Sequence, residues 1–203
     1  MALCLIPNAF AHTQGWELKR DREGVAIYTR ESPDSPLKEY RVTAVYNYPL
    51  EALFAESTDL LSRPEWVIRC SGVEIIDTVD GRIRYHTSYD LPWPFQDRDL
   101  VVELEVISSG PEEAHLLTRS IGLDYPLKEG VIRMPGYREE VFFEKIDDRR
   151  TRFRSEGFAD PGGTVPAWLV NLFLVDGIYD TVIRTRERLA EEEQASLLSR
   201  QAR

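Results

Sequence analysis

The sequence predicts an α+β protein, in which a curved, largely antiparallel β-sheet packs against one long C-terminal α-helix. From Gly24 to Phe158 apolar and polar residues mostly alternate, which is typical of strands with one buried face. From about Val165 past Ala190 the apolar residues instead recur every three or four positions, which indicates a helix. A large twisted sheet curls, and one helix does not fill its concave face. The pattern therefore predicts an internal apolar cavity.

Length and charge limit the number of domains and the kinds of partner. The chain has 203 residues and a formal net charge of −10, which fits one domain of ordinary globular composition. Phosphate backbones and anionic lipid headgroups both attract positive surfaces. We therefore expect no nucleic-acid partner and no purely electrostatic docking on a membrane.

Cysteines and histidines are too few and too scattered for a metal or redox site. Cys4 and Cys70 are the two cysteines, and His12, His86 and His115 are far apart in the sequence. No metal-ligand spacing, phosphate-binding loop, dinucleotide fingerprint or nucleophile elbow is present. The sequence predicts no disulfide, no metal, no cofactor and no catalytic residues of a recognisable enzyme class.

The N-terminus ends in a cleavage-site pattern. A short apolar run is followed by Ala9-Phe10-Ala11, which has the form of a signal-peptidase site. We interpret residues 1–11 as the remnant of a signal peptide, which implies a periplasmic or secreted protein. The alternative is a disordered N-terminus on a cytoplasmic protein.

The individual elements follow from period and turn signals. Strands and one helix are expected at Val25–Arg30, Leu37–Tyr48, Leu50–Ser57 (helix), Val73–Val79, Arg82–Leu91, Leu100–Ser108, Ala114–Ile121, Val131–Ile146 with an interruption near Pro135-Gly136, and Thr151–Phe158. Asp59–Trp66 is expected to be a short helical piece or a loop. Residues 12–190 form the predicted domain, and residues 191–203 a charged tail that is expected to be a frayed end of the helix.

One strand offers candidate ligand contacts. Tyr85, Thr87 and Tyr89 share a face with Ile83, which suits an apolar ligand with one polar group. The alternative is a packed core in which the tyrosine hydroxyls find partners. On the opposite face, His86 is expected to be a surface residue.

Three motifs resemble a known family. They are Arg63-Pro64-Glu65-Trp66 before a strand, Pro92-Trp93-Pro94 leading to Asp97-Arg98-Asp99-Leu100-Val101, and the segment 160–171, DPGGTVPAWLVN, at the entry to the last helix. Together they resemble a StAR-related lipid-transfer (START) domain of the helix-grip superfamily, with most similarity to bacterial members. The resemblance extends over nearly the whole chain.

The resemblance implies a sheet that grips the C-terminal helix, with a tunnel for one lipid between them. The helix and a neighbouring loop would act as a lid, and the protein would carry or present its ligand, with transient membrane contact. Residues implied to line the tunnel are Tyr85, Thr87, Tyr89, Val102, Leu104, Trp168, Leu169 and Leu172. Arg98 and Asp99 match the family motif, and we interpret them as residues that fix loops.

The ligand class stays open at this stage. The buried acid and arginine shared by sterol-binding members align near Thr87 and at Leu104, neither of which ionises. A sterol is therefore disfavoured, and a fatty acid, a phospholipid, an isoprenoid or another apolar molecule remains.

Two other functions are alternatives. Other helix-grip families include polyketide cyclases and aromatases, and in an enzyme of that kind Tyr85, Tyr89 and Arg119 would be the acid–base groups. A module that binds a protein partner through its surface is the third hypothesis. Gly162-Gly163 precedes the helix and is expected to turn the chain rather than to bind an anion.

Overall fold

The computed structural model describes residues 15–122 and 124–201. The predicted signal-peptide remnant, residues 1–11, lies outside this range and stays a prediction. No helix among the described residues is long and apolar enough to cross a membrane.

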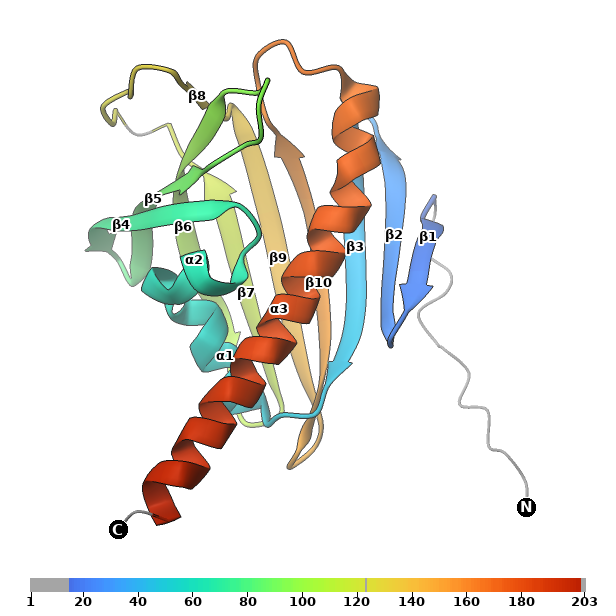
Figure 1. The fold of residues 1–203 in the computed structure, drawn as a ribbon, viewed down its shortest axis with the longest axis vertical. Coiled ribbons are helices and arrows are strands. Elements are labelled where there is room, and N and C mark those ends of the chain that lie inside the picture. The colour runs from blue at the N-terminus through green and yellow to red at the C-terminus, as the bar shows by residue number, and fades with distance from the viewer. Residues whose placement is uncertain (1–14, 123, 202–203) are drawn as a thin grey trace.

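A single ten-stranded sheet forms most of the molecule, in the order β1-β2-β3-β10-β9-β7-β6-β5-β4, with β8 beside β6 (Figure 1). All neighbouring strands are antiparallel except β6 and β8, which are parallel. The strands are β1 (Glu17–Arg22), β2 (Val25–Ser32), β3 (Ser35–Tyr46), β4 (Cys70–Val79), β5 (Arg82–Tyr89), β6 (Asp97–Ser109), β7 (Glu113–Ser120), β8 (Val131–Arg133), β9 (Gly136–Asp147) and β10 (Arg150–Asp160).

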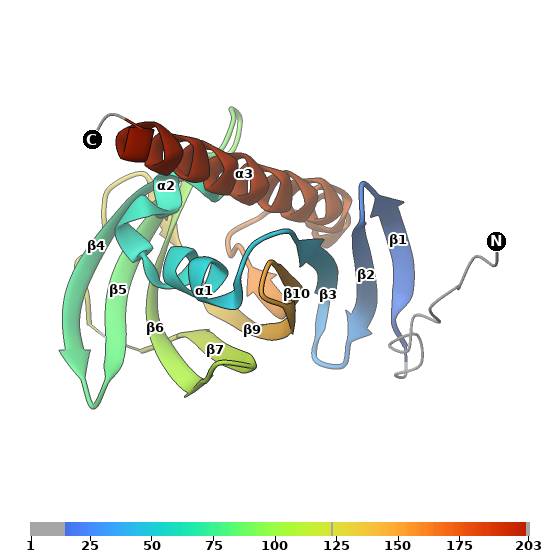
Figure 2. The same cartoon turned by 90° about the horizontal axis from the view of Figure 1, so that it is seen from below.

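The helices lie on the concave side of the sheet. They are α1 (Leu50–Thr58), the 3₁₀ turn η1 (Leu60–Ser62), α2 (Arg63–Trp66) and α3 (Ala167–Gln201). Figure 2 shows the sheet curled into a trough, with α3 across its open side and α1 and α2 inside it. The predicted fold class, a curved antiparallel sheet around a long C-terminal helix, is confirmed.

Period-two alternation explains which face is buried. Val25 and Ile27 on β2, Val42 on β3, Phe143 on β9 and Tyr85 on β5 are at most 2% exposed, and all belong to the core on the concave side. Their sequence neighbours point to the outer face. The core therefore lies between the sheet and the helices.

The structure adds one strand, confirms one interruption and extends the last helix. β1 was not expected, because its sequence ELKRDR is mostly charged; among the described strands it is an edge strand that pairs with β2. The interruption near Pro135-Gly136 is confirmed and separates β8 from β9. Residues 191–201 of the predicted charged tail are helical and continue α3, because strong helix formers follow and Arg188 pairs with Glu192 one turn later.

Both halves of α3 are fastened to the sheet. In the first half the Asn171 side chain accepts a hydrogen bond from the Lys38 amide (3.0 Å) and donates one to the Pro36 carbonyl (3.3 Å). In the second half Arg186 donates to the carbonyls of Glu23 (2.8 Å) and Val45 (3.2 Å). These contacts hold the helix over the concave face.

Candidate functional site

Most of the predicted lining residues lie on the concave face. Tyr85, Thr87, Val102 and Leu104 are at most 3% exposed and belong to the paired strands β5 and β6. Tyr89 at the end of β5 is half-buried. These side chains face the trough, as the alternation predicts.

The prediction for the helix is partly wrong. Trp168 and Leu172 are 67% and 59% exposed and lie on the solvent side of α3, whereas Leu169 is half-buried. The side chains that pack against the core are instead Leu174, Val175 and Ile178. Trp168 and Leu172 are four residues apart and share one stripe, and the nearly all-round apolar sequence gave no signal for the helix's orientation.

A charged side chain without a partner faces the interior. Arg63 begins α2, and its Nε is shielded from solvent with no hydrogen-bond partner. In the described part of the chain, no hydrogen bond or ion pair to its guanidinium is found. The Arg63 guanidinium lies over the Trp66 ring, with its Cζ 5.4 Å from the ring centroid. A shielded charge is costly unless a counter-charge or donor–acceptor partner offsets it.

The surroundings of Arg63 keep it charged. Burial alone lowers the pKa of Arg63, but nearby acidic groups outweigh this effect and raise the pKa above its usual value. These groups belong to concave-face residues: Tyr85, Tyr89, Tyr137 and Glu139. The guanidinium therefore lies among polar side chains beneath α3 and stays positive.

Glu139 on β9 is the acidic member of this cluster. Its Oε1 accepts hydrogen bonds from Ser155 (2.8 Å) and Tyr40 (3.1 Å), and its Oε2 accepts one from Tyr137 (2.8 Å). Glu139 is half-buried and shares the concave face with Val141. We call Arg63, Glu139, Tyr40, Tyr89, Tyr137 and Ser155 the polar cluster.

The tyrosines of the polar cluster are neutral hydrogen-bond donors at physiological pH. Burial raises the pKa of Tyr89 to about 12. Burial, followed by the charge of Glu139, raises the pKa of Tyr40 and Tyr137 well above the usual value. Neither chemistry nor geometry points to a tyrosinate base here.

A glycine makes room for one of these hydroxyls. A Cβ at Gly157 would lie 2.6 Å from the Tyr40 hydroxyl and 2.8 Å from the Arg138 carbonyl oxygen. Glycine at this position of β10 therefore lets Tyr40 reach Glu139 across the strand.

Sequence reasoning missed both charged members of the polar cluster. Arg63 was noticed only as part of a tryptophan-containing motif. Glu139 had a usable signal, because Tyr137, Glu139, Val141 and Phe143 form a period-two series in which an acid occupies an interior position.

The prediction that His86 is a surface residue is wrong. His86 is 2% exposed, and its Nε2 lies 2.9 Å from Oδ2 of Asp99, which is 1% exposed. Arg133 on β8 donates to both Asp99 oxygens (2.7 and 2.9 Å), and Tyr125 stacks on the imidazole at 4.8 Å. The loop before β8 thus covers this outer face, which strand alternation does not reveal.

Arg98 and Asp99 fix loops, as predicted. Arg98 donates to the Pro161 carbonyl (2.7 Å) and to the Gln96 carbonyl. Gly162 and Gly163 have φ of 64° and 69°, and a Cβ at Gly163 would lie 2.9 Å from Cδ1 of Ile132. The glycine pair therefore turns the chain into α3 next to the Pro161 carbonyl that Arg98 holds, which agrees with the loop-geometry interpretation.

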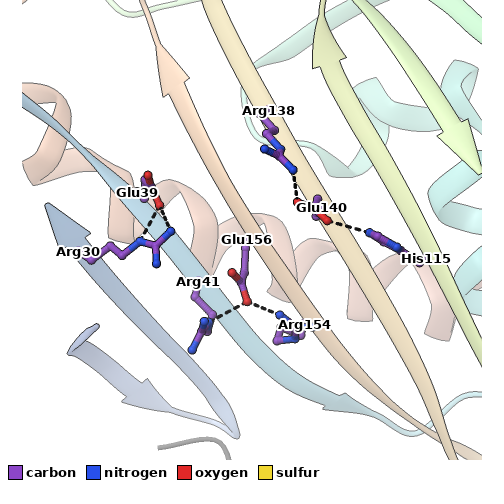
Figure 3. Close-up of polar contacts among 8 residues, drawn as sticks. All are labelled: Arg30, Glu39, Arg41, His115, Arg138, Glu140, Arg154 and Glu156. Atoms are coloured by element: carbon purple, nitrogen blue, oxygen red, sulfur yellow. Dashed lines mark hydrogen bonds and ion pairs between the residues drawn. The ribbon is translucent and has the colours of Figure 1, made fainter. Parts of the chain in front are cut away.

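The outer face of the sheet is occupied by mutual ion pairs, shown in Figure 3: Arg30 with Glu39, Glu156 with Arg41 and Arg154, and Glu140 with Arg138 and His115. A depression of about 520 Å³ lies on this face. Arg119 also lies there, paired with Glu103 at 3.0 Å. Arg119 is thus on the opposite side of the sheet from Tyr85 and Tyr89, so the three residues proposed for a cyclase do not meet.

No cluster of three or more histidine, cysteine or acidic side chains suited to a metal ion occurs among the residues that the structure describes. A sheet that grips a long C-terminal helix, with polar groups held beneath the helix, defines a helix-grip protein.

Comparisons with known proteins agree with this class. No family model matches the chain. The phosphatidylcholine transfer protein of Rattus norvegicus is 28% identical over 171 residues, covering 80% of this chain and 78% of that protein. The fold resembles human StAR-related lipid transfer protein 5 (TM-score 0.82, 20% identity, 90% of each chain).

A bacterial structure is also similar. The STAR-related lipid transfer protein fragment of Xanthomonas axonopodis has a TM-score of 0.78 and 24% identity, and the match covers 87% of this chain and 99% of that one. The aromatase/cyclase Zhui of Streptomyces is more distant, with a TM-score of 0.55, 11% identity, and coverage of 78% of this chain and 94% of that one. The chain therefore has the START helix-grip fold, and its sequence resembles START lipid-transfer proteins.

Proposed function

We propose that the protein binds one lipid between the concave face of the sheet and α3 and carries it between membranes. Arg63 carries this proposal, because its Nε is shielded from solvent without a hydrogen-bond partner, which calls for an anionic or polar group from a ligand. The lipid-transfer names of similar proteins support the same function. Each buried methylene contributes about 0.8 kcal/mol, so an acyl chain needs an apolar container to cross water.

The polar cluster assigns an orientation to the lipid. Four of its members, Arg63, Tyr89, Tyr137 and Glu139, keep partial accessibility, as side chains that a ligand would cover do, whereas Tyr40 and Ser155 are buried. The apolar part of the ligand would lie along Val102, Leu104 and the inward face of α3, with the polar end at Arg63. We propose a binding role without catalysis, since the cluster's tyrosines are neutral and Arg119 is on the far face.

Removing the Arg63 charge is expected to empty the protein. In native mass spectrometry of protein purified without detergent, the wild type should carry one lipid, identified from its organic extract. Arg63→Gln should lower the bound fraction about tenfold, since a hydrogen bond to a charged group contributes about 1.5–3 kcal/mol. Arg184→Gln, at an exposed position of α3, is the matched control.

Two outcomes would contradict the proposal. A wild type that takes up no lipid from a broad extract after delipidation would remove its basis. Equal lipid occupancy in Arg63→Gln and Arg184→Gln would show that Arg63 does not hold the polar end.

We propose that membrane contact uses the end of the molecule where α3 begins. Trp93 in the loop between β5 and β6 is 92% exposed, and Trp168 and Phe173 on α3 are 67% and 57% exposed. This loop and the first turns of α3 lie at the same end (Figure 1). With a net charge of −10, insertion of apolar side chains is favoured over electrostatic attraction as the way to dock.

Removing the two exposed indoles should slow lipid transfer without unfolding the protein. Each large apolar side chain contributes about 1.5–3 kcal/mol when buried, so Trp93→Ala with Trp168→Ala should lower transfer between neutral vesicles tenfold or more. Leu198→Ala, 60% exposed at the other end of α3, is the control. Transfer that is unchanged in the double variant would place the docking surface elsewhere.

A further inference from the structure

We propose that the polar cluster selects a zwitterionic phospholipid whose headgroup carries a phosphodiester and an amine with at least one N–H. Phosphatidylethanolamine has this chemistry. The inference rests on the proposed lipid-binding function and specifies its ligand.

The charges of the cluster call for a ligand with both signs. Arg63 and Glu139 interact electrostatically, but no ion pair joins them within the described chain. A ligand with one negative and one positive group offsets both charges at once. A fatty acid would pair with Arg63 and leave Glu139 without a cation, and a sterol would offset neither.

Glu139 has room for one more hydrogen-bond donor. A carboxylate has about four acceptor positions, and Glu139 uses two on Oε1, for Tyr40 and Ser155, and one on Oε2, for Tyr137. The remaining position on Oε2 fits a single N–H. A protonated amine supplies that donor together with a positive charge, so its hydrogen bond to Glu139 is charge-assisted.

The tyrosines favour an N–H group over a quaternary ammonium. Quaternary ammonium ions are recognised by the faces of aromatic rings. Tyr40 and Tyr137 instead direct their hydroxyls at Glu139. At this position the cluster offers oxygen atoms, and an amine that has lost every N–H leaves the free acceptor of Glu139 without a partner.

The test is a headgroup methylation series on the delipidated wild-type protein. Binding is measured with neutral vesicles that carry phosphatidylethanolamine, its N-monomethyl or N,N-dimethyl form, or phosphatidylcholine, all with the same acyl chains. Since one N–H is enough for the free position, the first two methylations should change affinity little. The third should lower it about tenfold or more.

Two variants of adjacent residues locate the effect. Glu139→Gln should remove the step at the third methylation, because the cation loses its carboxylate. Glu140→Gln, one residue along β9 and paired with His115 on the outer face, should keep the step.

The outcomes separate the inference from the proposed function. Equal binding of all four lipids by the wild type overturns the inference and leaves lipid binding intact. Binding of none of them, nor of any other lipid, overturns both. If Glu139→Gln still loses affinity at the third methylation, a residue other than Glu139 binds the amine.

Discussion

Replacing Asp99 with asparagine is expected to lower the free energy of unfolding by about 3 kcal/mol at pH 7. Asp99 accepts two hydrogen bonds from Arg133 and lies 2.9 Å from the ring nitrogen of His86. Asparagine removes the negative charge and turns one acceptor into a donor that faces the Arg133 guanidinium. The remaining buried polar groups then lack hydrogen-bond partners, and this unsatisfied desolvation accounts for most of the lost stability.

The effect of Asp99→Asn should fade in acid. Burial raises the pKa of Asp99, but the hydrogen bonds and charges of Arg133 and His86 outweigh burial and lower the pKa below its usual value. A carboxyl whose pKa is lower in the folded state stabilises the fold above the unfolded pKa of about 3.9 and loses that contribution as pH falls further. The wild type should therefore approach the variant below about pH 4.

Thermal and urea unfolding of both proteins, at pH 7 and in acid, measure the stability loss and its dependence on pH. A loss of about 3 kcal/mol corresponds to a decrease of roughly 6–12 °C in Tm for a chain of this length. Asp124→Asn, at an exposed position in the loop before β8, is the control and should change little. A loss for Asp99→Asn that is the same at both pH values would show that shape rather than charge is responsible.

Strand alternation was enough to place the concave face but not to find what is charged there. Tyr85 and Val102 fall on the predicted side, because a period of two fixes the side of every residue once one face is buried. Arg63 comes from a four-residue helix with no periodic signal, and it reaches the interior only through tertiary placement. The charged members of the polar cluster therefore had to be found in three dimensions.

The errors about burial share one cause: whether a side chain is buried depends on segments that are distant in the sequence. His86 alternates with interior residues, so the pattern predicts that it is exposed to solvent. In the structure Tyr125 stacks on it from a loop that has no regular sequence pattern. Trp168 and Leu172 are apolar and were placed inside, but they are exposed. In each case the sequence contains the local pattern and omits the partner that decides burial.

Replacing Arg188 with methionine is expected to lower the free energy of unfolding by about 3 kcal/mol at neutral pH. Arg188 on α3 donates to Oε1 of Glu56 on α1 at 2.9 Å and also pairs with Glu65 and Glu192. The Glu56 side chain is 5% exposed. Removal of its cation leaves a buried carboxylate without a counter-charge.

The deficit of Arg188→Met should also shrink in acid, but here because the variant gains stability, whereas with Asp99→Asn the wild type loses it. Burial raises the pKa of Glu56 above its usual value, although Arg188 lowers it in part. Without Arg188 the pKa should rise further. A carboxyl whose pKa is higher in the folded state binds its proton more tightly there, so the variant should regain stability as pH falls through that raised pKa.

A double variant separates charge from packing. Glu56→Gln combined with Arg188→Met removes the unpaired charge and should be more stable than Arg188→Met alone at pH 7. Arg184→Met, one turn earlier on an exposed face, is the single-site control. If the double variant is as unstable as the single one, the alkyl stem of Arg188 is responsible and not its charge.

The same variant tests how α3 opens. Arg186 and Arg188 fasten its second half to backbone carbonyls and to α1, whereas the Asn171 amide fastens its first half to β3. If the first half is the part that opens, Asn171→Ala should speed lipid release with little loss of stability. Arg188→Met should lower stability more than it speeds release, and release faster in Arg188→Met than in Asn171→Ala would place the opening at the C-terminal half.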